Sequence, residues 1–164
     1  MLRISKLTDY GTVILATLAG QTPSVRLTAA DVAERTRIGL PTVSKLLKSL
    51  QRGGLVASTR GSCGGYQLAR PATRITAADI LDALEGKLAL TECSSQHSHC
   101  GIESTCRVGH AWQRVNVAIR RSLEDITLAQ LAGIERVALR DSTVPSTARG
   151  NEVPLVRMPR PTQD

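Results

Sequence analysis

One short stretch, residues 93–112, concentrates the side chains that could bind a metal. It contains three of the four cysteines, all three histidines and the only tryptophan. Cys93 and Cys100 are seven residues apart, Cys106 follows six residues later, and His110 lies four residues beyond Cys106. Because residues four apart share one face of a helix, Cys106 and His110 could both reach one metal centre.

The donor set of this stretch suits two kinds of metal centre. Three thiolates are good ligands for zinc or for an iron–sulfur cluster. Structural zinc sites usually have cysteines two to four residues apart, so the wider spacing here favours a cluster. The segment between Cys93 and Cys100 has no hydrophobic periodicity, and a bound metal would order it. Zinc and three unligated thiols are the alternatives.

The sequence also indicates a cytoplasmic protein. The N-terminal residues lack the apolar run and the small-residue cleavage site of a secretory signal. No stretch approaches the roughly 20 apolar residues of a membrane span. In a reducing compartment, clustered cysteines are more often metal ligands or redox groups than disulfide partners.

The basic residues that make the chain positive lie in its first half. Residues 1–74 carry 11 Lys and Arg against 3 Asp and Glu, whereas residues 75–140 carry 7 against 8. A one-sided basic segment indicates an anionic partner, nucleic acid before membrane. Charge that serves only solubility is the alternative. The 164 residues have room for one domain with attachments, and its core must be aliphatic because phenylalanine is absent.

Three helices are expected in the basic half. Thr8 is predicted to cap the first helix, which Gly20 ends, and Thr28 is predicted to cap a short second helix. Pro41 is well placed to start the third helix. The third helix has an apolar stripe and a polar outer face, which together fit the second helix of a helix-turn-helix. The stripe is Val43, Leu46, Leu47 and Leu50, and the outer face is Thr42, Ser44, Lys45, Lys48 and Gln51.

A hairpin is expected directly after the third helix. Two strand-like segments, 55–59 and 66–69, flank a glycine-rich turn. A hairpin in this place is typical of a DNA-binding wing, whose glycines let the backbone approach phosphates while Arg60 enters a minor groove. A nucleotide-binding phosphate loop is the rival interpretation, but no Gly-Lys-Ser/Thr follows. The candidate DNA contacts are Thr42, Ser44, Lys45, Lys48, Arg60, Gly61, Gly64, Gly65 and Tyr66.

Two further helices are predicted. Thr76 should cap a helix that buries Ile80, Leu81 and Leu84. A second, long helix should carry an apolar seam with spacings of three or four residues. We expect this helix to pack against a second copy of the chain, since DNA readers of this type usually act as two-fold dimers; packing within one chain is the alternative. The seam consists of Val108, Trp112, Val115, Ile119, Leu123 and Ile126.

Several motifs resemble those of the IscR/NsrR-type winged-helix regulators, which are transcription factors with an iron–sulfur cluster. Within this family the likeness is greatest to the regulators of the SUF iron–sulfur assembly operon. It covers roughly residues 1–133, and its most specific parts are the wing and the three-cysteine stretch. The motifs are Leu7-Thr8-Asp9-Tyr10-Gly11, Ser44-Lys45-Leu46-Leu47-Lys48, Gly54-Leu55-Val56, the wing segment 60–71, Leu90-Thr91-Glu92-Cys93 and Ile126-Thr127-Leu128.

The resemblance implies a mainly α fold with a small β-hairpin wing and a long dimerisation helix. Residues 1–86 would form the winged helix-turn-helix domain, 87–106 the cluster loop, and 107–133 the dimerisation helix with a short following segment. From composition, residues 140–164 are expected to be a disordered tail, since they are rich in Pro, Ser, Thr and Arg and have no periodicity. It also implies a 2Fe–2S cluster, or 4Fe–4S in some members, held by Cys93, Cys100, Cys106 and a variable fourth ligand. The candidates for that ligand are His110, His99, His97 and Asp9 of the partner subunit.

Two departures from the family pattern bear on the fourth ligand. The spacing between the first two cysteines is one residue longer than in the best-known members, and a family histidine would follow Cys106 by three residues, not four. Cys63 in the wing also replaces a residue that is usually not cysteine, and we interpret it as incidental.

The function expected from these features is transcriptional control. The chain would be a homodimeric repressor of iron–sulfur assembly genes that binds double-stranded DNA and senses through its cluster. A zinc-stabilised regulator without a sensing role and a regulator responsive to nitric oxide or redox state are the alternatives. An enzyme such as a disulfide oxidoreductase is not expected, because the chain lacks a close Cys-x-x-Cys pair and a carboxylate–histidine constellation.

Overall fold

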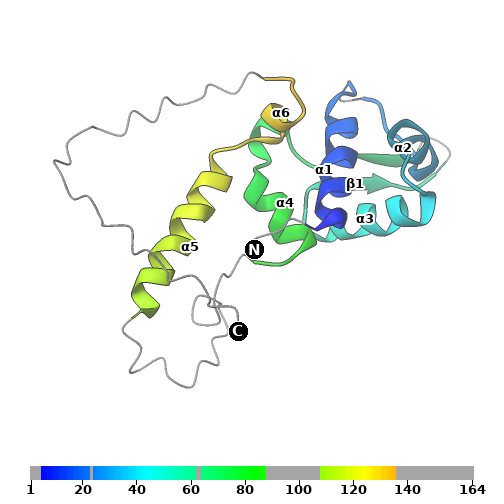
Figure 1. Ribbon diagram of the computed structural model, residues 1–164. Helices are drawn as coiled ribbons and strands as arrows, with labels where there is room; N and C mark the ends of the chain where they lie inside the picture. Colours follow the sequence, from blue (N-terminus) through cyan, green and yellow to red (C-terminus); the bar gives the residue numbers. More distant parts are fainter. Residues whose placement is uncertain (1–4, 23, 62–63, 88–107, 136–164) are drawn as a thin grey trace, which may run out of the picture.

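The computed structural model of the chain describes residues 5–22, 24–61, 64–87 and 108–135 (Figure 1). Its elements are six α-helices, one short 3-10 helix and one antiparallel hairpin among these residues. The expected fold class, mainly α with a small hairpin, is therefore confirmed. In chain order the elements are α1 (Lys6–Ala19), α2 (Ala29–Thr36), α3 (Leu40–Arg52), β1 (Val56–Thr59), β2 (Gly65–Leu68), η1 (Ala72–Arg74), α4 (Ala77–Leu84), α5 (Gly109–Glu124) and α6 (Leu128–Leu131).

The first helix starts earlier than predicted. Ser5 is its N-cap, because the Ser5 hydroxyl oxygen accepts a hydrogen bond from the Thr8 backbone N–H at 3.3 Å. The prediction that Thr8 caps this helix was wrong. Thr8 instead faces inward with 3% of its surface exposed, and its hydroxyl donates to the carboxylate of Glu85 at the end of α4. The predicted end at Gly20 is confirmed.

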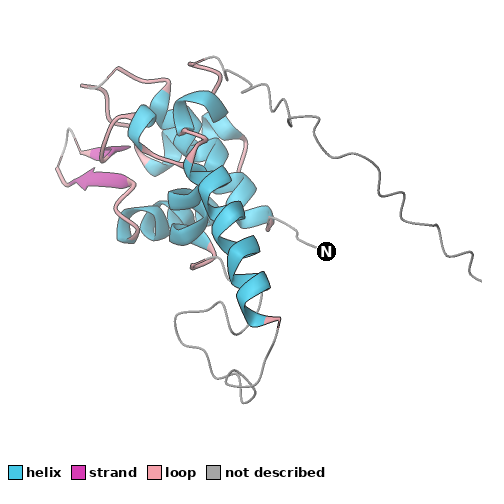
Figure 2. Ribbon diagram, turned by 90° about the vertical axis from the view of Figure 1, so that its left-hand side faces the viewer, coloured by secondary structure: helices cyan, strands magenta, loops and turns pink. Residues whose placement is uncertain are grey.

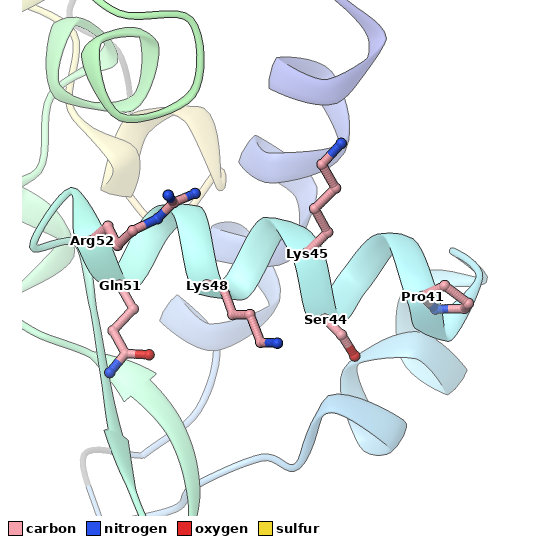
Figure 3. Close-up of a pocket in the computed structure, with 6 residues that line it drawn as sticks. All are labelled: Pro41, Ser44, Lys45, Lys48, Gln51 and Arg52. Atoms are coloured by element: carbon pink, nitrogen blue, oxygen red, sulfur yellow. The ribbon is translucent and has the colours of Figure 1, made fainter.

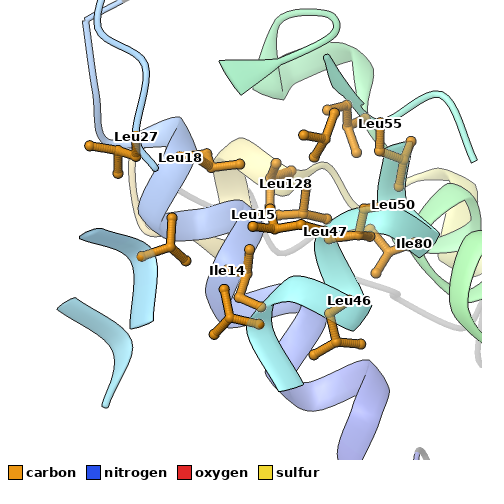
Figure 4. Close-up of a cluster of buried hydrophobic side chains, with 14 residues drawn as sticks. Ile14, Leu15, Leu18, Leu27, Leu46, Leu47, Leu50, Leu55, Ile80 and Leu128 are labelled. Carbon is orange, nitrogen blue, oxygen red and sulfur yellow. The ribbon is translucent and has the colours of Figure 1, made fainter. Parts of the chain in front are cut away.

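The second and third helices form the predicted pair. Thr28 caps α2 in a capping box with Asp31, and Pro41 lies in the first turn of α3. Arg37 makes the turn between them with a left-handed backbone, φ 58°. The predicted apolar stripe of α3 is completely buried and joins residues of α1, β1, α4 and α6 in one core (Figure 4). This stripe fixes which face of α3 points outward.

The wing is a two-stranded hairpin in which Val56 pairs with Leu68 and Ser58 with Tyr66. Its second strand is tied to the helical body, because Tyr66 N–H donates to Leu27 C=O at 2.8 Å and Leu27 N–H donates to Tyr66 C=O at 3.0 Å. Figure 2 shows the hairpin at one edge of the helical body.

The last helices leave the body and return to it. Helix α5 lies beside α4 and extends away from the core, as Figures 1 and 2 show. Arg120 of α5 and Asp82 of α4 form an ion pair at 2.9 Å. After α5 the chain turns back, and Leu128 of α6 is fully buried in the same core as the stripe of α3. The C-terminal end of α5 is therefore anchored, while its first turn projects.

Candidate nucleic-acid interface

The outer face of α3 forms an open hollow of about 780 Å³. Ser44, Lys48 and Gln51 point to one side of the helix, while Lys45 and Arg52 point to the other (Figure 3). Of the predicted contacts on this helix, the structure brings Ser44, Lys45 and Lys48 together at the hollow. Its full lining is Pro41, Ser44, Lys45, Lys48, Gln51 and Arg52.

The hollow is positively charged. Lys45, Lys48 and Arg52 contribute three cations, and both lysines are exposed. The ion pairs found in the described part of the chain join Arg70 to Asp79 and Arg120 to Asp82 and Glu124, so none of them neutralises this hollow. Unneutralised cations on an exposed helix face attract phosphate groups.

One further predicted contact, Thr42, lies at the start of α3. Thr42 is half-buried in the first turn, and the N-cap of the helix is Gly39, which provides no side-chain hydrogen bond. Pro41 has no backbone N–H, and the Thr42 N–H donates to the Gly39 C=O at 2.9 Å, so the start of this helix offers an anion few free backbone donors.

Sequence reasoning placed Gln51 on the outer face of α3 but did not include it or Arg52 among the DNA contacts. The position of Gln51 was readable from Lys48, since residues three apart share a helix face, whereas Arg52 points to the other side with Lys45. Sequence alone could not show that both line the same hollow as Lys48.

The turn of the wing requires its glycines. Gly61 has φ 111°, a backbone conformation that residues with a side chain rarely adopt. A Cβ on Gly64 would lie 2.4 Å from the Thr59 carbonyl oxygen, so only glycine fits there. Arg60 is exposed at this tip. The glycines therefore leave the backbone bare beside a cation, as a close approach to phosphates needs.

Tyr66 has a different environment from the other predicted contacts. Its ring is half-buried and packs against the core, and its backbone is bonded to Leu27. The structure therefore gives Tyr66 a role in holding the wing. A DNA contact through Tyr66 stays a prediction.

The predicted metal ligands are only partly covered by the structure. The three cysteines, His97 and His99 lie outside the described residues, as do Cys63 and the 140–164 tail. His110 is exposed in the first turn of α5, and Asp9 is exposed in the first turn of α1. Within the described residues, no group of three or more His, Cys, Asp or Glu is arranged to hold a metal.

The predicted apolar seam of α5 is covered by the protein's own chain on only part of its length. Ile119 and Leu123 are half-buried near the anchored end of the helix. Trp112 and Val115, toward the projecting end, are 44% and 42% exposed. Packing within one chain therefore accounts for only part of this surface. No helix among the described residues has the length and apolar character needed to cross a membrane.

Comparison with known proteins identifies relatives along most of the chain. Residues 4–133 match the Rrf2 family model, described as an iron-dependent transcriptional regulator. Protein rrf2 of Nitratidesulfovibrio vulgaris is 32% identical over 130 residues, which are 79% of this chain and 87% of that protein.

Solved structures with the same fold include two named regulators. The global cysteine regulator CymR of B. subtilis has a TM-score of 0.63 and 28% identity, covering 82% of this chain and 99% of CymR. IscR of T. potens has a TM-score of 0.60 and 29% identity, covering 84% of this chain and 92% of IscR. The winged-helix resemblance inferred from the sequence is thereby confirmed.

Proposed function

Because the chain belongs to the Rrf2 family of DNA-binding transcriptional regulators and is not an enzyme, we propose that it represses iron–sulfur assembly genes as a cluster-sensing homodimer. The observation that carries the DNA-binding part is the hollow on α3, where three cations lie beside a glycine-rich wing. A regulator with this task acts on the chromosome, in the cytoplasm.

In this proposal, α3 enters the major groove of an operator. Thr42 and Ser44, near the start of the helix, lie closest to base edges and discriminate between sequences. Lys45 and Lys48 bind phosphates on the two sides of the helix, and the Arg60 side chain enters the minor groove. The bare backbone at Gly61, Gly64 and Gly65 rests against the phosphate chain.

The proposed dimer is formed through α5. Its exposed apolar residues, Trp112 and Val115, lie on the projecting half, where a second copy would bury them. Two-fold symmetry then places the two α3 helices in adjacent major grooves, about 34 Å apart.

The cysteine stretch connects the two helices on which this geometry depends. It lies in the chain between α4, which packs on the DNA-binding core, and α5, the proposed dimer helix. We assign Cys93, Cys100 and Cys106 as ligands of an iron–sulfur cluster, 2Fe–2S before 4Fe–4S, with His110 or the partner subunit's Asp9 as fourth ligand. When bound, such a cluster would link the three thiolates through iron and would respond to oxidants, and its loss would release them. Release of these ligands would change the population of dimers that can span both half-sites.

A DNase footprint on the promoter of the protein's own operon tests the proposal. The wild-type protein should protect two half-sites, with a different affinity after anaerobic cluster reconstitution. Lys48→Ala should weaken binding to all sequences, whereas Ser44→Ala should change the preference between sites. Absence of protection in both cluster states contradicts the proposal.

The absorption spectrum of protein purified without air tests the cluster separately. Wild-type protein should be red-brown, and Cys93→Ser should remove the colour. Cys63→Ser is the matched control and should keep it, since we assign Cys63 no metal. A colourless sample that contains zinc supports the alternative of a zinc-stabilised regulator. A protein named as a cysteine regulator has a similar structure, so the fold alone does not identify the signal. Titrations with iron, nitric oxide and peroxide are needed to identify it.

A further inference from the structure

A side-chain hydrogen bond joins α3 to the wing, and its acceptor is not among the DNA contacts proposed above. The Gln51 amide Nε2 donates to the Ser58 hydroxyl oxygen at 2.8 Å, and both residues are exposed. Gln51 is in the last turns of α3 and lines the cationic hollow, whereas Ser58 lies on β1. The bond therefore connects the two parts of the interface.

The polarity of this bond determines what Ser58 can do next. A serine hydroxyl has one hydrogen to donate and two lone pairs that accept. The bond from Gln51 occupies a lone pair and leaves the hydroxyl hydrogen available. Because the amide fixes the position of the oxygen, the remaining hydrogen has a restricted set of directions. Ser58 is therefore an oriented donor in need of an acceptor.

The position of Ser58 is constrained by its strand. It shares a face of β1 with Val56, which is buried, and its strand partner Tyr66 is bonded to Leu27 of the helical body. The hydroxyl is thus held on β1 next to Gln51 at the end of α3, with Arg60 two residues further along the chain.

We propose that Ser58 is a phosphate-binding residue of the DNA interface and that Gln51 is the residue that positions it. A phosphodiester oxygen is an acceptor only, which matches a hydroxyl whose remaining group is a donor. Gln51, to which Ser58 is bonded, lines the cationic hollow, so a duplex backbone bound there would pass close to Ser58. The inference rests on the proposed interface, and it adds a neutral, directional contact to the charged ones.

A neutral contact differs measurably from a charged one. Replacing a lysine that binds a phosphate reduces the salt slope of binding, log K against log salt, by about 0.9 per phosphate. Ser58 releases no counterion, so its loss should lower the affinity and leave the salt slope unchanged. A hydrogen bond to a charged group corresponds to about tenfold in affinity for each contact.

The test measures binding of the full-length protein to a random-sequence duplex of about 30 base pairs, long enough for two adjacent major grooves. Ser58→Ala should weaken binding about tenfold or more with an unchanged salt slope, and Ser58→Thr, which keeps the hydroxyl, should restore most of the affinity. Gln51→Met should weaken binding in the wild-type background and have no effect in the Ser58→Ala background. Thr59→Val is the matched control, because it removes a hydroxyl from the opposite face of the same strand and should bind as wild type.

Each result decides one part of the inference. Wild-type affinity in Ser58→Ala, or no recovery in Ser58→Thr, overturns the phosphate contact. An equal effect of Gln51→Met in both backgrounds overturns its positioning role. If wild-type protein binds neither this duplex nor its promoter, the proposed function itself fails, which is a different outcome. As a control, the thermal unfolding midpoint of each variant is compared with that of the wild type. Equal midpoints exclude a folding defect as the cause of weaker binding.

Discussion

Helix α6 should be part of the same cooperative unit as the DNA-binding domain, and one leucine tests this. Leu128 is fully buried among core residues of α1, α3 and α4, although it follows α5 in the chain. Replacing a buried leucine with alanine removes apolar contacts and leaves a cavity, at a cost of about 2 to 5 kcal/mol. That is a large share of the roughly 5 to 15 kcal/mol that stabilise a typical domain.

The matched control lies in the same helix. Leu131 is 46% exposed, so Leu131→Ala should change the free energy of unfolding by less than about 0.5 kcal/mol. Backbone bonds of the α6 segment are the same in both variants, including Leu128 N–H to Ile75 C=O at 2.7 Å. The difference between the variants therefore isolates burial of one side chain.

Urea unfolding of both variants, followed by far-ultraviolet circular dichroism, gives the two free energies. A difference of about 3 kcal/mol corresponds to a thermal midpoint lower by about 6 to 12 °C for a chain of this size. We also expect Leu128→Ala to weaken dimer formation, because the anchor of α5 is loosened. Equal stability of Leu128→Ala and Leu131→Ala refutes the reasoning, since α6 would then not be docked in the core.

Three other predictions concern separate contacts. Gly53→Ala should destabilise the fold by about 1 to 3 kcal/mol in urea unfolding, because the new Cβ lies 2.5 Å from the Ala83 Cβ; unchanged stability contradicts this close approach. Hydrogen bonds from the Ser5 and Thr8 hydroxyls lower the pKa of Glu85, so this carboxylate stabilises the fold above the unfolded pKa of about 4.3 and loses the effect as pH falls through its lower folded value. The wild type should therefore be more stable than Glu85→Gln near neutral pH, by less than about 1 kcal/mol because the group is solvent-exposed. This difference in the free energy of unfolding should disappear on acidification, and a difference independent of pH contradicts the prediction. Trp112→Ser should shift the dimer toward monomer in analytical ultracentrifugation without lowering the thermal midpoint of the monomer, and an unchanged dimer removes α5 from the interface.

Local sequence signals predicted the winged-helix unit well because they depend on short-range chemistry. Thr28 and Thr76 cap their helices as expected, and Pro41 starts α3. The apolar stripe of α3 and the glycine turn follow from helical period and allowed backbone angles. The misplaced cap on α1 shows the limit of such signals. Ser5 and Thr8 are both good caps, and the burial of Thr8 against Glu85 decides between them.

The candidate metal centre was inferred from residue types alone. Cys93, Cys100 and Cys106 have a donor set and a spacing that can be read in the sequence. The fourth ligand of such a centre would depend on distances across the fold and, for Asp9, on a partner subunit, which spacing along the chain does not encode.

By itself, the sequence determined the helix-turn-helix, the wing and the lysines on the outer face of α3, because periodicity, caps and glycines act within a few residues. Only the tertiary structure decided which groups meet from distant positions. It buried Leu128 in a core whose other members lie between Ile14 and Ile80, paired Arg120 with Asp82, and oriented the Ser58 hydroxyl with the Gln51 amide. The physical reason is that hydrogen bonds and apolar contacts depend on separation in space, and packing of the whole core sets that separation.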